Sequence, residues 1–382
     1  LFPKGVIHNM KIICKKSELL NSVNIVLRAV SSKSTLPILE CMVIDVSENH
    51  IKLISNDMEL AIETIVNGEI MDSGTNKQIA INAKVFSEII RKLSDNDIII
   101  ETDDHFTMTI TCEKAKFNIA GKPADEFPTL PRIERQEAIV LSQFTLKEVI
   151  RQTVFSISDN ESNKIMTGEL FEVTDNEMRV VSLDGHRISI RKLRLKENYG
   201  NFKVIVPGKT LIEISKILSG EMSDEVTLYF TNKHVLFEFE DTLVLSRLIE
   251  GEYYKINQML SNDYETKIVI NKKEFFNCID RSTLLIKESE KKPIIVGVTD
   301  NNMELRINSN IGSMKEEIDI KKEGKDILIG FNPKFLMDVL RVVDDEEVTI
   351  YMINPKAPCF IKDREETYIY LILPVNFNAA NI

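Results

Sequence analysis

The segment SLDGHRIS (182–189) brings three side chains with catalytic potential together: Asp184, His186 and Arg187. A carboxylate, an imidazole and a guanidinium can act as acid, base and anion clamp in proton-transfer chemistry. The chain has only five histidines, so one between an aspartate and an arginine requires an explanation. Apolar runs, MRVV before and ISIRKL after, flank the segment. The segment is therefore a catalytic cluster, a binding surface or a tight turn between two strands.

Other signs of catalysis are missing from the sequence. The patterns G-x-x-x-x-G-K-[ST], G-x-G-x-x-G and G-x-S-x-G, which mark phosphate, dinucleotide and nucleophile sites, do not occur. The histidines are scattered, and the five cysteines are odd in number and form no C-x-x-C pair. We therefore expect no cofactor, no metal site and no disulfide framework, and a reducing cytoplasm as the location.

The elements around these residues recur three times. Three segments share apolar positions at helical spacing: INAKVFSEIIRKL (81–93), VPGKTLIEISKIL (206–218) and FNPKFLMDVLRVV (331–343). Their first lysines, Lys84, Lys209 and Lys334, lie 125 residues apart. A second helix is predicted in each copy, over 15–30, 146–157 and 272–286. The remaining segments are mostly alternating strands, so the pattern predicts three copies of one α+β unit.

The length of 382 residues is sufficient for two or three domains with their own cores. With junctions near Arg135 and Asn262, the repeat predicts domains over residues 10–135, 136–262 and 263–382. Residues 1–9 precede MKIICKKSELL, which is typical of a natural start, and are expected to be an extension or an expression remnant.

The repeated helix carries a basic stripe in an acidic chain. Each helix has a second basic residue seven positions after its lysine, on the same face: Arg91, Lys216 and Arg341. The acidic residues Glu88, Glu213 and Asp338 follow each lysine by four positions, where an ion pair is expected. Each window carries a net charge of +1, although the chain carries −11. If the three helices share one surface, that surface suits a phosphate backbone, contacted without base recognition.

The chain resembles the bacterial sliding clamp family, the β subunits of replicative DNA polymerase III, from Met10 to about Phe377. The segments that carry the resemblance are STLPILECMVID (34–45), AGKPADEFPTLP (120–131), VSLDGHRIS (181–189), VIVPGKTLIEI (204–214) and YLILPV (370–375). The resemblance implies the DNA clamp fold, with three repeated clamp-type domains, helices lining a ring and strands outside. It also implies a head-to-tail homodimer that encircles double-stranded DNA as a non-catalytic processivity factor. Its partners would be the replicative polymerase, the clamp loader and repair proteins, bound through short linear motifs, and it would contact no membrane.

The resemblance assigns site residues by position. The DNA-binding set is Lys33, Lys84, Arg91, Asn160, Lys164, Lys209, Lys216, Lys334 and Arg341. The dimer-interface set is Ile89, Phe117 and Ile119 on one side and Leu284 and Leu285 on the other. The peptide-binding set is Met166, Leu183, Gly185, His186, Arg187, Ile188, Tyr254, Gln258, Met259, Pro358, Leu371, Ile372, Leu373, Pro374 and Val375. The family usually has a proline and often an arginine where Tyr254 and Gln258 stand, so a bulkier and less basic rim is expected.

The equivalent hairpins of the other two repeats favour a binding role for the opening segment. LISNDMELAI (53–62) keeps the aspartate as Asp57, and RINSNIGSMK (306–315) has Asn310 near that position, but neither contains Gly-His-Arg. The fold therefore does not require those three residues. Two other hypotheses remain: a three-domain enzyme that uses Asp184, His186 and Arg187, and a monomeric scaffold that binds peptides but not DNA.

Overall fold

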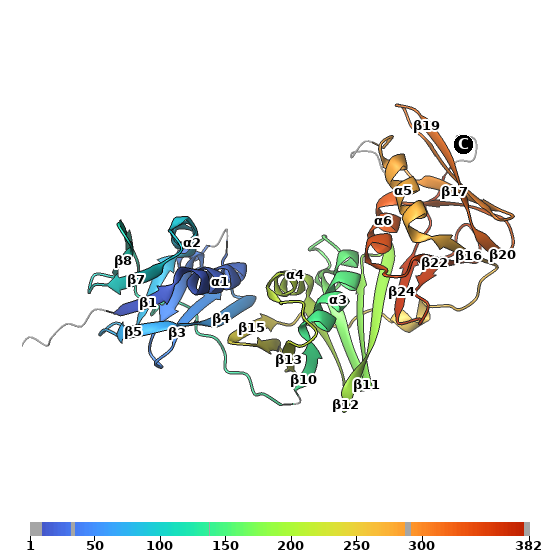
Figure 1. Ribbon diagram of the computed structural model, residues 1–382. Helices are drawn as coiled ribbons and strands as arrows, with labels where there is room; N and C mark the ends of the chain where they lie inside the picture. The colour runs from blue at the N-terminus through green and yellow to red at the C-terminus, as the bar shows by residue number, and fades with distance from the viewer. Residues whose placement is uncertain (1–9, 32–34, 137, 287–291, 378–382) are drawn as a thin grey trace, which may run out of the picture. The chain divides into compact units, whose positions relative to one another are not determined.

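The computed structural model describes residues 10–31, 35–136, 138–286 and 292–377 (Figure 1). The predicted extension 1–9 and Lys33 lie outside these ranges. The described residues form two compact units. The first unit comprises the described residues up to Gln143 together with Lys216–Leu248, and the second comprises Phe144–Ser215 and the described residues from Ile249.

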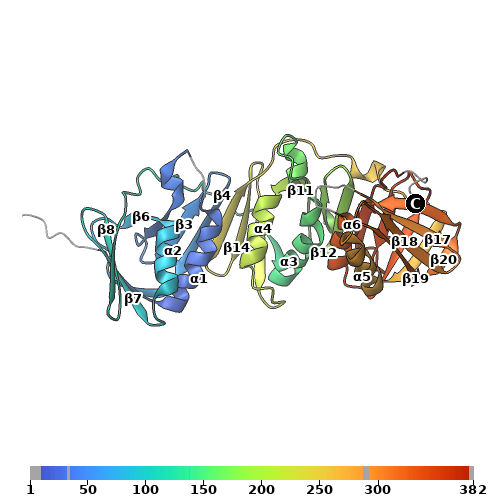
Figure 2. The ribbon, with the colours of Figure 1, turned by 90° about the horizontal axis from the view of Figure 1, so that it is seen from above.

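The first unit contains two helices, α1 (Lys16–Val26) and α2 (Ala83–Lys92), and two antiparallel sheets. A five-stranded sheet has the order β5-β1-β7-β8-β9, and an eight-stranded sheet has the order β10-β13-β14-β15-β4-β3-β2-β6. The strands are β1 (Lys11–Lys15), β2 (Cys41–Asp45), β3 (Ile51–Asn56), β4 (Leu60–Val66), β5 (Gly68–Asp72), β6 (Gln78–Asn82), β7 (Asp97–Thr102), β8 (Thr107–Cys112), β9 (Ala115–Ala120), β10 (Ile139–Ser142), β13 (Glu225–Phe230), β14 (His234–Phe239) and β15 (Thr242–Arg247). The two helices lie side by side, and α1 packs on β3 and β4 (Figure 2).

The second unit contains α3 (Gln143–Thr153), whose first residue belongs to the first unit, α5 (Lys272–Thr283), α6 (Pro333–Val342) and most of α4 (Gly208–Ile217). Its sheets have the orders β11-β12-β24-β23-β22-β16-β20 and β19-β18-β17-β21. The strands are β11 (Gly168–Leu183), β12 (Arg187–Pro207), β16 (Thr266–Asn271), β17 (Ile294–Thr299), β18 (Asn302–Asn308), β19 (Ser313–Asp319), β20 (Lys321–Gly324), β21 (Ile327–Phe331), β22 (Glu347–Met352), β23 (Cys359–Lys362) and β24 (Tyr368–Ile372). Helices α5 and α6 pack against each other.

The predicted helices and strands are confirmed, with two differences in detail. Three helices begin at an asparagine that caps them: the side chains of Asn82, Asn271 and Asn332 each accept a hydrogen bond from a backbone N–H of the first turn. One difference is that the helix predicted in 206–218 begins only at Gly208, because Pro207 is the last residue of β12, whereas Pro333 is the first residue of α6. The two strands predicted around 171–182 form one long irregular strand, β11.

Both units bury apolar cores, and the five cysteines lie free in them. None of the helices in the described ranges is long and apolar enough to cross a membrane.

Candidate functional site

The segment 182–189 is a tight hairpin between β11 and β12. Asp184 organises the turn, because its Oδ1 accepts hydrogen bonds from the backbone N–H groups of His186 (2.9 Å) and Arg187 (3.1 Å). Gly185 has a φ of +88°, a left-handed conformation that favours glycine. The turn is thus built by local chemistry, and the side chains of residues 186 and 187 are left for other tasks.

Arg187 anchors the hairpin to the rest of the second unit. Its Nε donates to Asp184 Oδ2 (2.9 Å), one terminal nitrogen donates to Asp338 Oδ2 (2.7 Å), and the other donates to the carbonyl of Phe155 (2.6 Å). The guanidinium also lies over the ring of Phe335, 4.3 Å from its centroid. Only 6% of Arg187 is exposed, so it supports the site from within rather than standing at a rim.

The arrangement does not suit acid–base catalysis. Both carboxylate oxygens of Asp184 are engaged by the backbone and by Arg187. The exposed ring of His186 instead stacks near Phe335, with centroids 6.2 Å apart. In the described part of the chain, no group of three His, Cys, Asp or Glu side chains could hold a metal ion. The segment is therefore a structured surface rather than a reaction centre.

An apolar cluster lies next to the hairpin. Leu183, Ile188 and Leu371 are buried in it, and Met166 and Tyr254 pack against it half-exposed. The Tyr254 hydroxyl accepts a hydrogen bond from Asn163 (2.7 Å), which holds the 254–259 connection near the hairpin. We call these five cluster residues together with Leu373 and Met259 the hairpin surface. Leu373 and Met259 are 37% and 41% exposed, large values for apolar side chains.

The other predicted peptide-binding residues lie in different environments. Gln258 is exposed at the end of a short 3₁₀ helix, Ile256–Gln258, and Pro358 is half-buried before β23. Ile372 points to the opposite face of β24, where it is fully buried in the core built around α5 and α6. Its side chain is therefore remote from the hairpin surface, unlike those of its neighbours Leu371 and Leu373.

The C-terminal segment, including Pro374, is fastened at two points. The N–H of Leu373 donates to the carbonyl of His186 (2.8 Å), and the N–H of Val375 donates to the carbonyl of Gly330 (2.8 Å). A Cβ on Gly330 would lie 2.6 Å from Val375 O, so only glycine permits this approach. Residues 373–375 thus form one edge of the hairpin surface.

The basic residues predicted to contact DNA are exposed wherever the structure describes them. Lys84, Arg91, Lys209, Lys216, Lys334 and Arg341 all lie on the solvent side of α2, α4 and α6, and Asn160 and Lys164 are exposed in the 158–167 segment.

Two of the predicted ion pairs on these helices are wrong. Glu88 pairs with Arg91 at 2.5 Å rather than with Lys84. Asp338 is turned inward, where it pairs with Arg187 (2.7 Å) and more loosely with Arg341 (3.4 Å), rather than with Lys334. Because Asp338 turns inward, it does not neutralise Lys334, as the sequence had predicted that it would.

The predicted dimer positions lie on one edge strand, within α2 and just after α5. Phe117 and Ile119 lie on β9, an edge strand, and Phe117 is 40% exposed. Leu284 follows α5 and is 78% exposed. Ile89 and Leu285 are half-buried.

Sequence reasoning missed the residues that support Arg187. Asp338 was expected to pair with Lys334 on the helix surface, and Phe155 and Phe335 were not singled out. The available signal was the position of Arg187 at the start of an apolar strand. An arginine buried there needs carboxylate partners from elsewhere in the chain.

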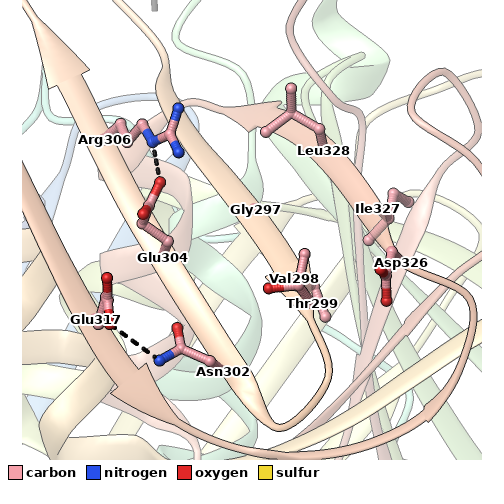
Figure 3. Close-up of a pocket in the computed structure, with 10 residues that line it drawn as sticks. All are labelled: Gly297, Val298, Thr299, Asn302, Glu304, Arg306, Glu317, Asp326, Ile327 and Leu328. Carbon is pink, nitrogen blue, oxygen red and sulfur yellow. Dashed lines mark hydrogen bonds and ion pairs between the residues drawn. The ribbon is translucent and has the colours of Figure 1, made fainter.

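A separate hollow of about 480 Å³ lies on the sheet of β17, β18, β19 and β21 (Figure 3). Polar pairs line it: Arg306 donates to Glu304, and Asn302 donates to Glu317 (3.2 Å). It shares no residue with the hairpin surface.

Comparison with known proteins identifies the family. Residues 10–131, 140–255 and 257–376 match the N-terminal, central and C-terminal domains of the DNA polymerase III beta subunit. The beta sliding clamp of Staphylococcus aureus is 33% identical over 374 residues, which cover 96% of this chain and 99% of the relative.

Solved structures agree. A putative DNA polymerase III beta subunit from Eubacterium rectale is 65% identical, with a TM-score of 0.93 over 96% of this chain and 100% of that one. The DNA polymerase sliding clamp of Bacillus subtilis is 34% identical, with a TM-score of 0.92 over 97% and 100%. The catalytic hypothesis for residues 184–187 is therefore wrong. The chain belongs to the DNA polymerase III β-subunit family and is a DNA sliding clamp without catalytic activity of its own.

Proposed function

We propose that two copies of this chain associate head to tail into a ring around duplex DNA. The three domains of each copy span residues 10–135, 136–262 and 263–382. In the cytoplasm, the ring tethers the replicative polymerase, and it also receives the clamp loader and repair proteins, through short linear motifs that dock on the hairpin surface.

Strand pairing within the chain supports the head-to-tail dimer. The last strand of the central repeat, β15, pairs with β4, and the last strand of the third repeat, β24, pairs with β12. Both pairs have the same register relative to the preceding hairpin: Leu60 faces Ser246, and Arg187 faces Ile372. The corresponding strands of the remaining pair, β9 and β19, both lie at sheet edges. An edge strand offers unpaired backbone groups, which a second copy would satisfy.

The main support for the head-to-tail dimer comes from the side chains that follow α3 and α5. Counted from the preceding strand, Phe155 and Leu284 occupy equivalent positions after α3 and α5. Phe155 contacts Tyr370 of β24, with ring centroids 5.9 Å apart. The residue of β9 that corresponds to Tyr370 is Phe117. By analogy with the contact between Phe155 and Tyr370, the exposed Leu284 would contact Phe117 of a second copy.

The basic stripes support DNA contact that does not depend on sequence. Exposed lysine or arginine pairs recur on α2, α4 and α6 in a chain whose net charge is −11. Such a surface attracts phosphates weakly and in a salt-dependent manner, which suits a ring that must slide.

The hairpin surface supports peptide docking. It combines exposed apolar side chains, Leu373 and Met259, with a rigid floor of Leu183, Ile188 and Leu371. Short motifs with apolar or aromatic anchors bind to surfaces of this kind.

A cysteine pair tests the dimer. By the register of β4 with β15, Phe117 faces Met314 of the partner subunit, and directly opposed residues of antiparallel strands have Cα atoms close enough for a disulfide. We expect the double variant Phe117→Cys, Met314→Cys to form a covalent dimer, or circle, under mild oxidation. The matched control Phe117→Cys, Lys321→Cys, with its second cysteine on β20, should stay monomeric in denaturing gels. Equal cross-linking in both variants, or none in the first, would contradict the proposed interface.

A further inference from the structure

A second small pocket lies in the first unit, at the hairpin between β3 and β4. Its volume is about 180 Å³, sufficient for one large side chain rather than a drug-sized ligand. Its walls come from the hairpin, the segment 128–131 and the ends of β14 and β15. We call it the first-unit pocket, and the residues used below are Asn56, Met58, Ala61, Leu130, Leu245 and Arg247.

The backbone of this pocket repeats that of the hairpin surface. Asp57 Oδ1 accepts from the N–H groups of Glu59 (3.1 Å) and Leu60 (2.8 Å), as Asp184 does in its own turn. The N–H of Arg247 donates to the carbonyl of Glu59 at 2.9 Å, which matches the bond from Leu373 to His186 at 2.8 Å. Met58 has a φ of +77°, close to the +88° of Gly185. The two sites therefore have the same backbone frame.

The side chains on that backbone frame are smaller or more polar in the first-unit pocket at three of four equivalent positions. By strand register, Leu183, Ile188, Leu371 and Leu373 correspond to Asn56, Ala61, Leu245 and Arg247. The pocket keeps an apolar wall, formed by Leu245, Leu130 and the exposed Met58. Asn56 donates from Nδ2 to the carbonyl of Pro128 (3.4 Å) and so holds the 128–131 segment against the hairpin.

The guanidinium of Arg247 stands at the rim of the first-unit pocket. Arg247 is exposed, and its guanidinium forms no ion pair with the other residues that the structure describes. The exposed Lys233 lies nearby in sequence, and burial, followed by the charges of Arg247 and Lys233, lowers the pKa of His234. The lining of the first-unit pocket also includes one acidic residue, Glu59, at the tip of the hairpin. An apolar wall beside an exposed guanidinium matches an apolar side chain next to a carboxylate.

We propose that the first-unit pocket is a second peptide-docking site, which takes an extended segment with one leucine-like anchor followed by an acidic residue. The inference uses the analogy with the hairpin surface and so rests in part on the proposed peptide docking there. Its selectivity differs, because Arg247 replaces the apolar Leu373 and calls for a carboxylate that the hairpin surface does not need.

A photo-reactive peptide tests both sites separately. The probe is acetyl-Ala-photoleucine-Asp-Ala-amide, the matched probe has Asn for Asp, and labelled residues are located by mass spectrometry on the full chain. We expect labelling at 56–61, 128–131 and 245–247 that falls about tenfold with the Asn probe or in the Arg247→Gln variant, as expected for the loss of a charge-assisted hydrogen bond. Met58→Glu should lower it too, while labelling around 371–375 stays.

The variant Leu373→Glu supplies the opposite control, because it should abolish labelling at the hairpin surface alone. First-unit labelling that is equal with both probes, or unchanged by Arg247→Gln, would overturn the proposal, as would labelling confined to 371–375. Labelling of the first-unit pocket without any at 371–375 would uphold this proposal and contradict the peptide docking proposed for the hairpin surface.

Discussion

Glu169 offers a sharp test of how the second unit is packed. This residue of β11 is fully buried, and burial raises its pKa to about 8, against a small opposing effect of Thr153. Thr153 Oγ1 lies 2.7 Å from the carbonyl of Val149 and 2.9 Å from Glu169 Oε2. The hydroxyl has one hydrogen, which it can give either to Val149 or to Glu169, and the buried Oε1 of Glu169 has no hydrogen-bond partner among the described residues. A carboxyl that is fully buried and has one oxygen without a donor is favoured in its protonated form, in agreement with the raised pKa.

The sign of the pH effect follows from this raised pKa. The unfolded chain ionises Glu169 from about pH 4.5, whereas the folded unit keeps it protonated to about pH 8. The contribution of Glu169 to the free energy of unfolding is therefore fully present below pH 4.5, and it is lost as the pH rises towards 8. At 1.36 kcal/mol per pH unit, the loss from this group is about 3 kcal/mol at pH 7. Glu169→Gln removes the titration and keeps a neutral hydrogen-bonding group.

We expect Glu169→Gln to raise the Tm of the second unit by roughly 6–12 °C at pH 7 and to change it little at pH 5. The assay is thermal unfolding followed across pH 5–8.5 for the parent and the variant. Glu177→Gln is the matched control, since Glu177 is exposed on the same strand and should give no pH-dependent difference. A difference between parent and variant that is the same at pH 5 and pH 8 would refute a protonated Glu169.

Further predictions concern the hairpin and the basic helices. Arg187→Gln removes the cation shared by the half-buried carboxylates of Asp184 and Asp338, of which Asp338 keeps a looser pair with Arg341, and should destabilise the second unit by about 2 kcal/mol. Asp338→Asn in the same chain should recover part of that loss in chemical unfolding, and strictly additive losses would argue against the ion pair. Deleting residues 373–382 should weaken the binding of a polymerase-tail peptide by about 2 kcal/mol and leave the dimer intact. Unchanged affinity would contradict peptide docking. Changing the first lysine of α2, α4 and α6 to glutamate should weaken DNA binding and flatten its salt dependence with little change in Tm, and unaltered binding would mean that these lysines are only a solvated face.

The repeat and its secondary structure could be predicted because they depend on local patterns. Apolar spacing within one helix or strand, as around Lys84 and Lys209, is set by the period of that element alone. The hairpin turn was predictable for the same reason, because Asp184 and Gly185 form it with their immediate neighbours.

The orientation of single polar side chains could not be predicted, because distant partners decide it. Asp338 turns inward to meet Arg187, 151 positions away in the chain, and no spacing within α6 indicates this. Ile372 is a different case: it was grouped with Leu371 and Leu373, although strand alternation alone places its side chain on the opposite face.

The measurement that tests the central claim most directly compares retention on circular and linear DNA. The protein is loaded onto a closed circular plasmid, the salt is raised to screen the basic stripes, and the bound fraction is measured before and after a single cut. A ring that encircles the duplex stays on the circle and is lost within minutes of linearisation, because it slides off the ends. Equal retention on the circle and on the cut plasmid would contradict encirclement.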